Sequence, residues 1–163
     1  MTQDRDVFPI LDRPCKGVQE LLDAYSQIGS TVTLSGPTNF APIIRKAMEI
    51  VGAHRQYHIL IIIADGDVTQ VQDTRTALQE ASYYPLSIIC IGVGDGPFGL
   101  MEELDDDVQH RAFDNFQFVD YHSIMLNHPT NPEIEFARRA LMEVPDQFLA
   151  IRKLGLLEST GGF

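Results

Sequence analysis

Two long apolar runs dominate the pattern of hydrophobic and polar positions along the chain. The first is HILIIIA at residues 58–64, and the second is LSIICIGV at residues 86–93. Continuous runs of Ile, Leu and Val without polar alternation are typical of strands that are covered on both faces, as in a parallel sheet flanked by helices. The shorter run FQFV at residues 116–119 predicts a third strand.

Apolar residues at helical spacing occur in the stretches around these runs. Residues 17–25 and 40–51 both place apolar side chains three and four positions apart, which predicts two amphipathic helices before the first strand. Between the first two strands, Asp73 is a candidate cap of a helix on which Leu78 and Ala81 share a face. The two strands and this helix therefore form a predicted strand-helix-strand unit.

A further helix is predicted in the segment TNPEIEFARRALMEVP. Asn131 is its candidate cap, Pro132 lies in its first turn, and Pro145 is expected to end it. The tail at residues 156–163 is expected to be disordered. Helices that alternate with buried strands predict an α/β fold of three layers with a mainly parallel sheet.

Composition and charge narrow the classes of function. The chain has 163 residues, which suits one domain. Its formal net charge of -11 opposes binding to nucleic acid and to anionic membranes. Two cysteines do not indicate a disulfide framework, no stretch approaches 18 apolar residues, and the first residues lack the features of a signal peptide. We therefore expect a cytoplasmic protein, with the nucleus as an alternative location.

Two polar segments carry the candidate chemistry. Asp65 and Asp67 follow the first apolar run directly, and LSGPTN at residues 34–39 precedes a predicted helix. In one interpretation Thr38 or Asn39 caps that helix, and the acidic pair starts a turn. In the other, the Thr38 hydroxyl and the Asp65 carboxylate converge on a hard cation at the carboxyl end of a strand, where α/β folds bind their ligands.

Five ordered blocks of the sequence carry a family resemblance. They are GPTNFAPII, QYHILIIIADGDVT, PLSIICIGVGDGPF, AFDNFQFVDY and ALMEVPDQ, and together they resemble the von Willebrand A-type domain of copines. RPCKG and FDNFQF are more similar still to the copine-like domain of the plant RING-type ubiquitin ligases called RGLG. The resemblance implies a partial copine-type domain over residues 1–155 that binds proteins and is not an enzyme.

The resemblance also implies a metal-ion-dependent adhesion site on the upper edge of the sheet. In the family, magnesium or manganese is held by an Asp-x-Ser-x-Ser segment, a threonine and an aspartate, and the last two correspond to Thr38 and Asp65. In an intact relative, an acidic residue of a protein partner completes the coordination. Membrane binding by copines depends on C2 domains, so the resemblance implies none for this chain. The residues expected to shape the metal loops are Gly36, Pro37, Asn39, Gly66 and Asp67.

The sequence departs from the family at the first metal segment. No Asp-x-Ser-x-Ser occurs in the 163 residues, so we expect the domain to be truncated at its N-terminus or diverged. Magnesium prefers six oxygen ligands, and Thr38 with Asp65 supplies two at most. Binding of Mg²⁺ or Mn²⁺ is therefore expected to be weak or absent. The strand at 58–64 would also lack a neighbour, and copies of the chain could then associate through its uncovered edge.

One alternative function uses the same acidic pair. ADGDVT matches the Asp-x-Asp-x-Thr signature of haloacid-dehalogenase-type phosphohydrolases, in which Asp65 would attack phosphorus and Asp67 would serve as acid and base. That chemistry also needs a lysine, and the only lysine after Asp65 is Lys153. The sequence therefore matches the phosphohydrolase signature but has no lysine close after it.

The remaining charged motifs favour ordinary surface roles. ELDDDV at residues 103–108 is predicted to be a solvated acidic loop rather than a calcium site, and Arg111 is predicted to form a surface salt bridge. A RING domain needs about eight Cys or His ligands, which two cysteines cannot supply. Ubiquitin ligase activity is not expected from this chain alone.

Overall fold

The computed structural model describes residues 5–29, 31–32, 37–54, 56–107, 109–128 and 130–157. The chain divides into two compact units, Met1–Pro37 and Thr38–Phe163. In the first unit, helix α1 (Val18–Gly29) forms where the apolar spacing predicted a helix. All residues of α1 are described and none is buried, so its apolar stripe is exposed. The stripe consists of Val18, Leu21, Leu22 and Tyr25.

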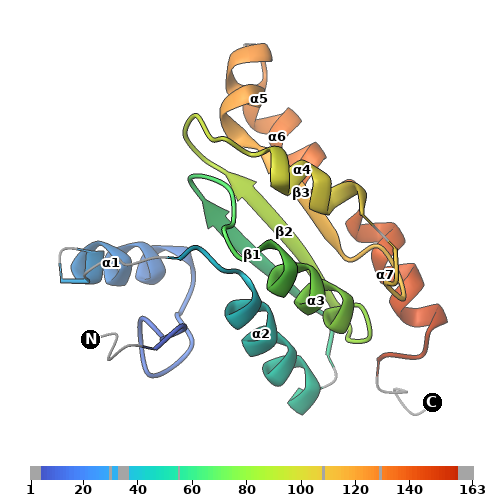
Figure 1. The fold of residues 1–163 in the computed structure, drawn as a ribbon. Coiled ribbons are helices and arrows are strands. Elements are labelled where there is room, and N and C mark those ends of the chain that lie inside the picture. Colours follow the sequence, from blue (N-terminus) through green and yellow to red (C-terminus); the bar gives the residue numbers. More distant parts are fainter. Residues whose placement is uncertain are drawn as a thin grey trace. The chain divides into compact units, whose positions relative to one another are not determined.

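The second unit alternates helices with strands (Figure 1). In chain order its elements are α2 (Ala41–His54), β1 (His58–Ala64), α3 (Val71–Ala81), β2 (Leu86–Gly92), α4 (Gly99–Asp106), β3 (Phe116–Asp120), α5 (Tyr121–Asn127), α6 (Pro132–Leu141) and α7 (Val144–Lys153). The three strands coincide with the three predicted apolar runs. No helix among the described residues has the length and apolar character needed to cross a bilayer.

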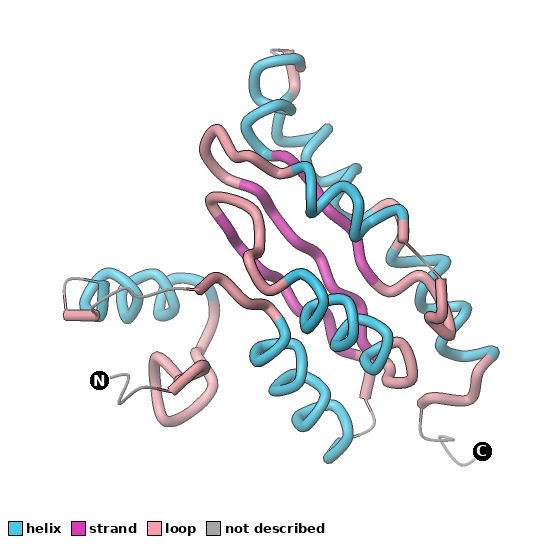
Figure 2. Tube along the Cα trace, viewed as in Figure 1, coloured by secondary structure: helices cyan, strands magenta, loops and turns pink. Residues whose placement is uncertain are grey.

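The three strands form one parallel sheet in the order β1-β2-β3. His58 pairs with Leu86, and Ile88 pairs with Phe116, so the strands start almost level with one another. Because all strands run in the same direction, their carboxyl ends lie at one edge of the sheet. The loops at that edge, coloured pink in Figure 2, carry the predicted metal residues of the second unit.

Helices pack on both faces of the sheet, and this confirms the predicted α/β three-layer fold. On one face, α2, α3 and α4 bury a large apolar core against alternate strand residues, including Ile62, Ile88 and Phe116. On the other face, α5 and α6 pack on Ile89 and Val119, and α7 contacts β2. The two cores lie on opposite faces because successive strand side chains point to opposite sides.

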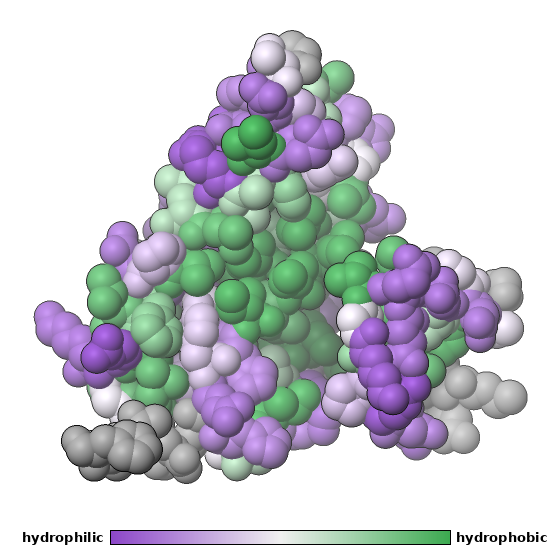
Figure 3. All heavy atoms as spheres, turned by 180° about the vertical axis from the view of Figure 1, so that it is seen from behind, coloured by the Kyte–Doolittle hydropathy of each residue, from purple (hydrophilic) through white to green (hydrophobic). Residues whose placement is uncertain are grey.

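The second layer of helices leaves one face of β1 uncovered. Ile59, Ile61 and Ile63 are 40%, 57% and 68% exposed, whereas Ile89 on β2 is 3% exposed. Viewed from behind, hydrophobic side chains gather over the middle of the molecule (Figure 3). The prediction of burial on both faces is therefore confirmed for β2 and wrong for β1. An apolar run indicates that a strand is suited to burial. Whether the strand is buried depends on which other elements pack against it.

Two predicted helix boundaries were wrong. Helix α3 begins at Val71, so Asp73 lies in its first turn, where it forms an ion pair with Arg45 at 2.9 Å. Pro145 does not end a helix but lies in the first turn of α7, a position where the missing N–H of proline has no cost. Both residues have roles compatible with a helix N-terminus, and the sequence did not reveal which turn they occupy.

Two charged motifs are less exposed than expected. The predicted acidic loop is wrong, because α4 includes residues 103–106 and the carboxylate of Asp105 lies against β3. The predicted surface position of Arg111 is also wrong, because its side chain is 1% exposed and donates to the Leu104 carbonyl at 2.5 Å. Burial lowers the pKa of Arg111, and Asp114 at 3.6 Å opposes this shift.

Candidate functional site

The structure brings the Thr38 loop against the loop that follows β1. The Thr38 carbonyl accepts hydrogen bonds from the backbone N–H of Thr69 at 3.0 Å and of Gln70 at 3.3 Å. The Thr69 hydroxyl donates to the same carbonyl at 3.1 Å. Two segments that are about 30 positions apart in sequence are thus fixed side by side at the carboxyl edge of the sheet.

The two predicted metal ligands keep their side-chain oxygens available. Thr38 and Asp65 are both exposed. Within the described ranges, neither the Thr38 hydroxyl nor the Asp65 carboxylate has a hydrogen-bond or ion-pair partner. An exposed carboxylate with free lone pairs can accept a cation or a donor from a partner molecule.

Asn39 fixes the start of α2. Its Oδ1 accepts from the Ala41 N–H at 2.9 Å, and its Nδ2 donates to the Asp73 carboxylate at 2.8 Å. This hydrogen bond, followed by the one from Arg45, lowers the pKa of Asp73. Asn39 therefore joins the beginning of α2 to the first turn of α3, beside the Thr38 loop.

Asp67 has a structural partner of its own. Its Oδ1 accepts from the backbone N–H groups of Leu100 at 3.1 Å and Met101 at 3.3 Å. Both N–H groups belong to the first turn of α4, where a carboxylate is favoured. The Met101 N–H also donates to the Phe98 carbonyl at 3.0 Å. Asp67 thus holds the start of α4 against the end of β1 through one of its two carboxylate oxygens.

The structure shows less about the other residues that were predicted to shape the metal loops. Gly66 separates the two aspartates, and a side chain added there would meet no atom within 4 Å. Pro37 is exposed and belongs to the first unit. Gly36 lies outside the described residues, as do residues 158–163 of the predicted tail.

The donor set does not fit a tight divalent site. No group of three or more His, Cys, Asp or Glu residues in the described ranges could hold a metal ion. Asn39 and one oxygen of Asp67 are engaged with helix N-termini, and Thr38 and Asp65 are the predicted ligands whose side-chain oxygens have no described partner. With two protein ligands, water would fill most of the six positions around the ion. Water ligands add no binding free energy, because the free ion is already hydrated.

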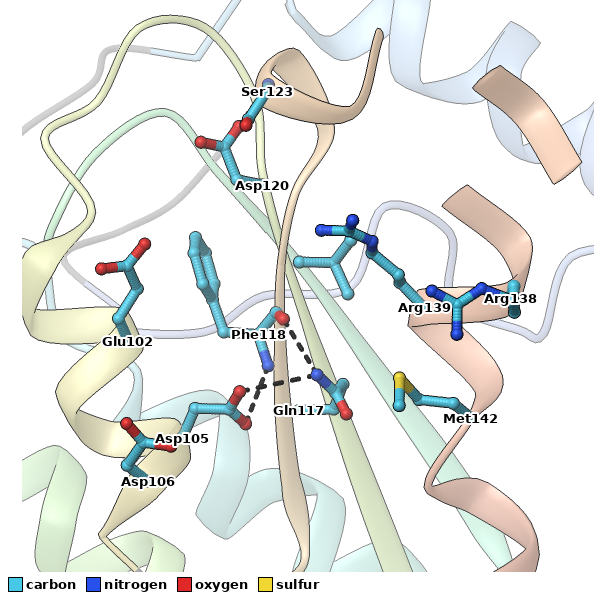
Figure 4. A pocket seen from close by; sticks show the side chains of 11 residues that line it. Glu102, Asp105, Asp106, Gln117, Phe118, Asp120, Ser123, Arg138, Arg139 and Met142 are labelled. Atoms are coloured by element: carbon cyan, nitrogen blue, oxygen red, sulfur yellow. Dashed lines mark hydrogen bonds between the residues drawn. The ribbon is translucent and has the colours of Figure 1, made fainter. Parts of the chain in front are cut away.

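A second polar region, which sequence reasoning missed, follows the outer edge of β3. A cavity of about 570 Å³ lies between α4, β3 and α6. In Figure 4, Asp105 points from α4 toward Phe118, while Arg139 lies on the opposite side with α6. The Asp105 carboxylate accepts from the Phe118 N–H at 3.1 Å, and the Gln117 amide donates to the Phe118 carbonyl at 3.1 Å.

Burial gives Asp105 an unusual titration. Removal from water raises the pKa of its carboxyl to about 7, the hydrogen bond from Phe118 lowers it, and nearby carboxylates such as Glu143 raise it. The signal in the sequence was the spacing of Asp105, which lies four positions after Met101 and beside Leu104. Both of those residues are fully buried, so this spacing placed Asp105 on the buried face of a helix.

The parallel sheet, the helices on both faces and the polar loops at the carboxyl edge define an α/β domain of the von Willebrand A-like class. The family model for copines matches residues 4–160, and the chain belongs to the copine family.

Comparison with individual relatives agrees with this assignment. A protein named Copine family protein 2 from Caenorhabditis elegans is 50% identical over 160 residues, which cover 95% of this chain and 2% of that protein. The E3 ubiquitin-protein ligases RGLG5 and RGLG2 of Arabidopsis thaliana are 48% and 46% identical and are matched over 99% of this chain. The chain spans 41% and 38% of those two ligases, so it corresponds to less than half of each.

Proposed function

We propose that this chain is a protein-binding module that recognises its partner at the carboxyl edge of the sheet, around Thr38 and Asp65. Membership of the copine family supports a role in protein interaction, and the ligases RGLG5 and RGLG2 contain a related region. In those ligases the corresponding region would recruit a substrate or another partner. The proposed function of this chain is accordingly recruitment rather than catalysis.

The observation that carries the proposal is the pair of free oxygens at one edge. The backbone bonds from Thr69 and Gln70 hold the Thr38 loop in place, so the hydroxyl and the Asp65 carboxylate are presented by fixed loops. Sites held by rigid elements lose less entropy when a partner binds than sites on mobile segments do. This arrangement suits recognition of one polar group.

The chemistry of the edge favours a partner with an acidic residue, bridged by Mg²⁺ or Mn²⁺. Without a cation, the Asp65 carboxylate would repel a second carboxylate. With a cation between them, two carboxylates neutralise its two charges, and the partner supplies an oxygen that this chain lacks. Metal and partner should therefore strengthen each other's binding by the same factor, because such coupling is reciprocal.

Calorimetric titration tests the metal part of the proposal. With the free chain, Mn²⁺ is expected to bind weakly, and one site of low-micromolar affinity would contradict the proposal. The partner part is tested with a fluorescent library of Glu-containing peptides, by anisotropy, with and without millimolar Mn²⁺. Asp65→Ala and Thr38→Val are expected to abolish Mn²⁺-dependent binding, whereas Asp146→Ala, which removes an exposed carboxylate on α7, should retain it.

The Thr38→Val variant separates the hydroxyl from the backbone. The Thr38 carbonyl, which accepts three of the hydrogen bonds at the loop, is unchanged in this variant. Retained peptide binding in both site variants would show that recognition occurs elsewhere on the molecule, and the proposed function would then be wrong.

A further inference from the structure

A cavity of about 360 Å³ lies between α7 and the segment that leads into β3. Phe113 and Asp114 line it from that segment, and Glu143, Asp146, Gln147 and Ala150 line it from α7 and the residue before α7. All six residues belong to the second unit. Since Asp114 precedes the first residue of β3, the cavity lies at the opposite end of that strand from the carboxyl edge.

The polar side chains of this cavity offer acceptors to an occupant. Asp114, Glu143 and Asp146 are carboxylates, and none of the six lining residues is basic. The fourth polar side chain, Gln147, donates its Nε2 to the Glu143 carboxylate at 3.3 Å, so its Oε1 is the group that remains. A lining of this kind suits an occupant that brings several donors and a positive charge.

Two of these acceptors are buried and lack a donor. Gln147 is 4% exposed, and no described group of the chain donates a hydrogen bond to its Oε1. The same holds for Oδ1 of Asp114. Buried polar atoms are rarely left unpaired, because the lost hydrogen bond to water is then not replaced. These two oxygens therefore point to a donor from outside the described chain.

Arg111 offsets part of the negative charge but does not supply that donor. Its Nη1 lies 3.6 Å from Oδ1 of Asp114, which is longer than a hydrogen bond. Its side chain is 1% exposed, and its Nη2 donates to the Leu104 carbonyl at 2.5 Å. Three carboxylates of the cavity thus face one enclosed guanidinium, and the excess charge is negative.

The titration of the carboxylates agrees with a missing cation. Burial raises the pKa of Glu143, the carboxylates of Asp114 and Asp146 raise it further, and the hydrogen bond from Gln147 lowers it. Burial also raises the pKa of Asp114, and Arg111 opposes that shift. The charged forms of both groups are thus disfavoured in the free protein. A cation held beside them would stabilise these forms.

The lining residues favour a guanidinium over a metal ion. In the part of the chain that the structure describes, no group of three or more His, Cys, Asp or Glu residues could hold a metal. A guanidinium has five N–H donors and no acceptor, which matches a lining of oxygens better than the three donors of an ammonium do. Phe113, which is 9% exposed, and Ala150 add apolar surface for the methylene groups of the side chain.

We propose that this cavity binds an arginine side chain of a partner protein. Free arginine suits it less well, because its α-carboxylate would meet three carboxylates and no basic lining residue. An arginine inside a polypeptide has no such carboxylate. The formal net charge of -11 also attracts a basic partner at long range. This contact goes beyond the proposed function, since it uses neither Thr38 nor Asp65.

The first experiment is an NMR titration of the full, ¹⁵N-labelled chain. The probe is an acetylated and amidated five-residue peptide with arginine at its centre, flanked by alanine and glycine. It is expected to shift the side-chain amide signals of Gln147 and the backbone amide signal of Asp114. The same peptide with citrulline, which has the shape of arginine without its charge, should bind about tenfold more weakly or less. Free arginine should also bind more weakly than the peptide.

Paired substitutions separate the cavity from the overall charge. Glu143→Gln combined with Asp146→Asn removes two carboxylates of the cavity and should weaken peptide binding about tenfold. Glu102→Gln combined with Asp95→Asn is the matched control, because it removes one exposed Glu and one exposed Asp that do not line this cavity. The control should bind the peptide like the wild type. Both pairs keep Thr38 and Asp65, so this test and that of the proposed function can fail separately.

Several outcomes would overturn the proposal. If the signals of Gln147 and Asp114 do not move at millimolar arginine peptide, the cavity does not take a guanidinium. Equal binding of the citrulline peptide would show that charge is not recognised. Equal weakening by the two pairs of substitutions would assign binding to the net charge of the chain rather than to the cavity. Tighter binding of free arginine than of the peptide would make the occupant a small molecule and not a partner protein.

Discussion

Replacement of Asp105 by asparagine gives a specific test of the buried carboxylate beside β3. In the native protein, burial raises the pKa of Asp105 to about 7, while an unfolded aspartate titrates near 3.9. Between these values the native state binds more protons than the unfolded state. The free energy of unfolding therefore falls as pH rises through this window and becomes level above about pH 8.

The magnitude follows from the same pKa difference. At about 1.36 kcal/mol per pKa unit, the upper bound is about 4 kcal/mol. Asp105 is only partly buried, so solvent screening reduces the expected effect to about 1–2 kcal/mol. Asparagine keeps the size of the side chain and an oxygen that can accept from the Phe118 N–H, but it carries no charge. Asp105→Asn should thus gain on the wild type as pH rises, with roughly one third of the difference present at pH 5 and the full difference of about 1–2 kcal/mol at pH 8.5.

Urea unfolding at pH 5, 7 and 8.5 measures this difference directly, and thermal unfolding should show a rise of about 3–6 °C in Tm at pH 8.5. Glu102→Gln is the control, because Glu102 is an exposed carboxylate on the same helix and does not contribute to the raised pKa of Asp105. Burial also raises the pKa values of Asp114 and Glu143. Both groups remain in the two proteins, so the comparison reports the charge of Asp105 together with its repulsion from them. Parallel profiles of Asp105→Asn and wild type from pH 5 to 8.5 would refute the assigned cause.

Two further predictions concern the positions that hold the fold together. Leu78 is fully buried between α3 and the sheet, so Leu78→Ala should lower the free energy of unfolding by about 2–5 kcal/mol. Ile50→Ala, on the exposed side of α2, should lower it by less than about 1 kcal/mol. Urea unfolding measures both values. Asp67→Ala removes an acceptor of the first turn of α4 and should lower the free energy of unfolding by about 0.5–2 kcal/mol. Asp65→Ala should change it little, because the Asp65 carboxylate binds no described group. Equal effects of the two aspartate variants would contradict the capping role of Asp67.

Much of the architecture was predictable because it depends on local pattern. The apolar runs at 58–64, 86–93 and 116–119 became β1, β2 and β3, and the spacing at 40–51 became α2. Period and composition reveal such elements, since a buried strand needs β-branched residues and an amphipathic helix needs apolar side chains three and four positions apart. Helix ends were harder, as Asp73 and Pro145 illustrate, because the same residue type suits several positions within a first turn.

The sequence proposed residues for the candidate site, and only the structure showed the hydrogen bonds around them. Thr38 and Asp65 were identified by resemblance, and the structure supplies the backbone bonds that bring their loops together. Asn39 was one of two candidate caps of α2, and its hydrogen bond from the Ala41 N–H confirms that interpretation. No pattern in the sequence showed that Asp67 would bind the N-terminus of α4. The bond of Asp67 depends on where a helix 33 positions away in sequence begins in space.

The sequence by itself determined the strands, most of the helices, the three-layer class and the acidic side chains at the carboxyl end of the first strand. Only the tertiary structure decided that β1 has one exposed face while β2 has none, that Arg111 is enclosed, and that Asp105 bonds the edge of β3. The physical reason is that side-chain type fixes the free energy gained on burial, whereas burial itself depends on which other elements lie within contact distance.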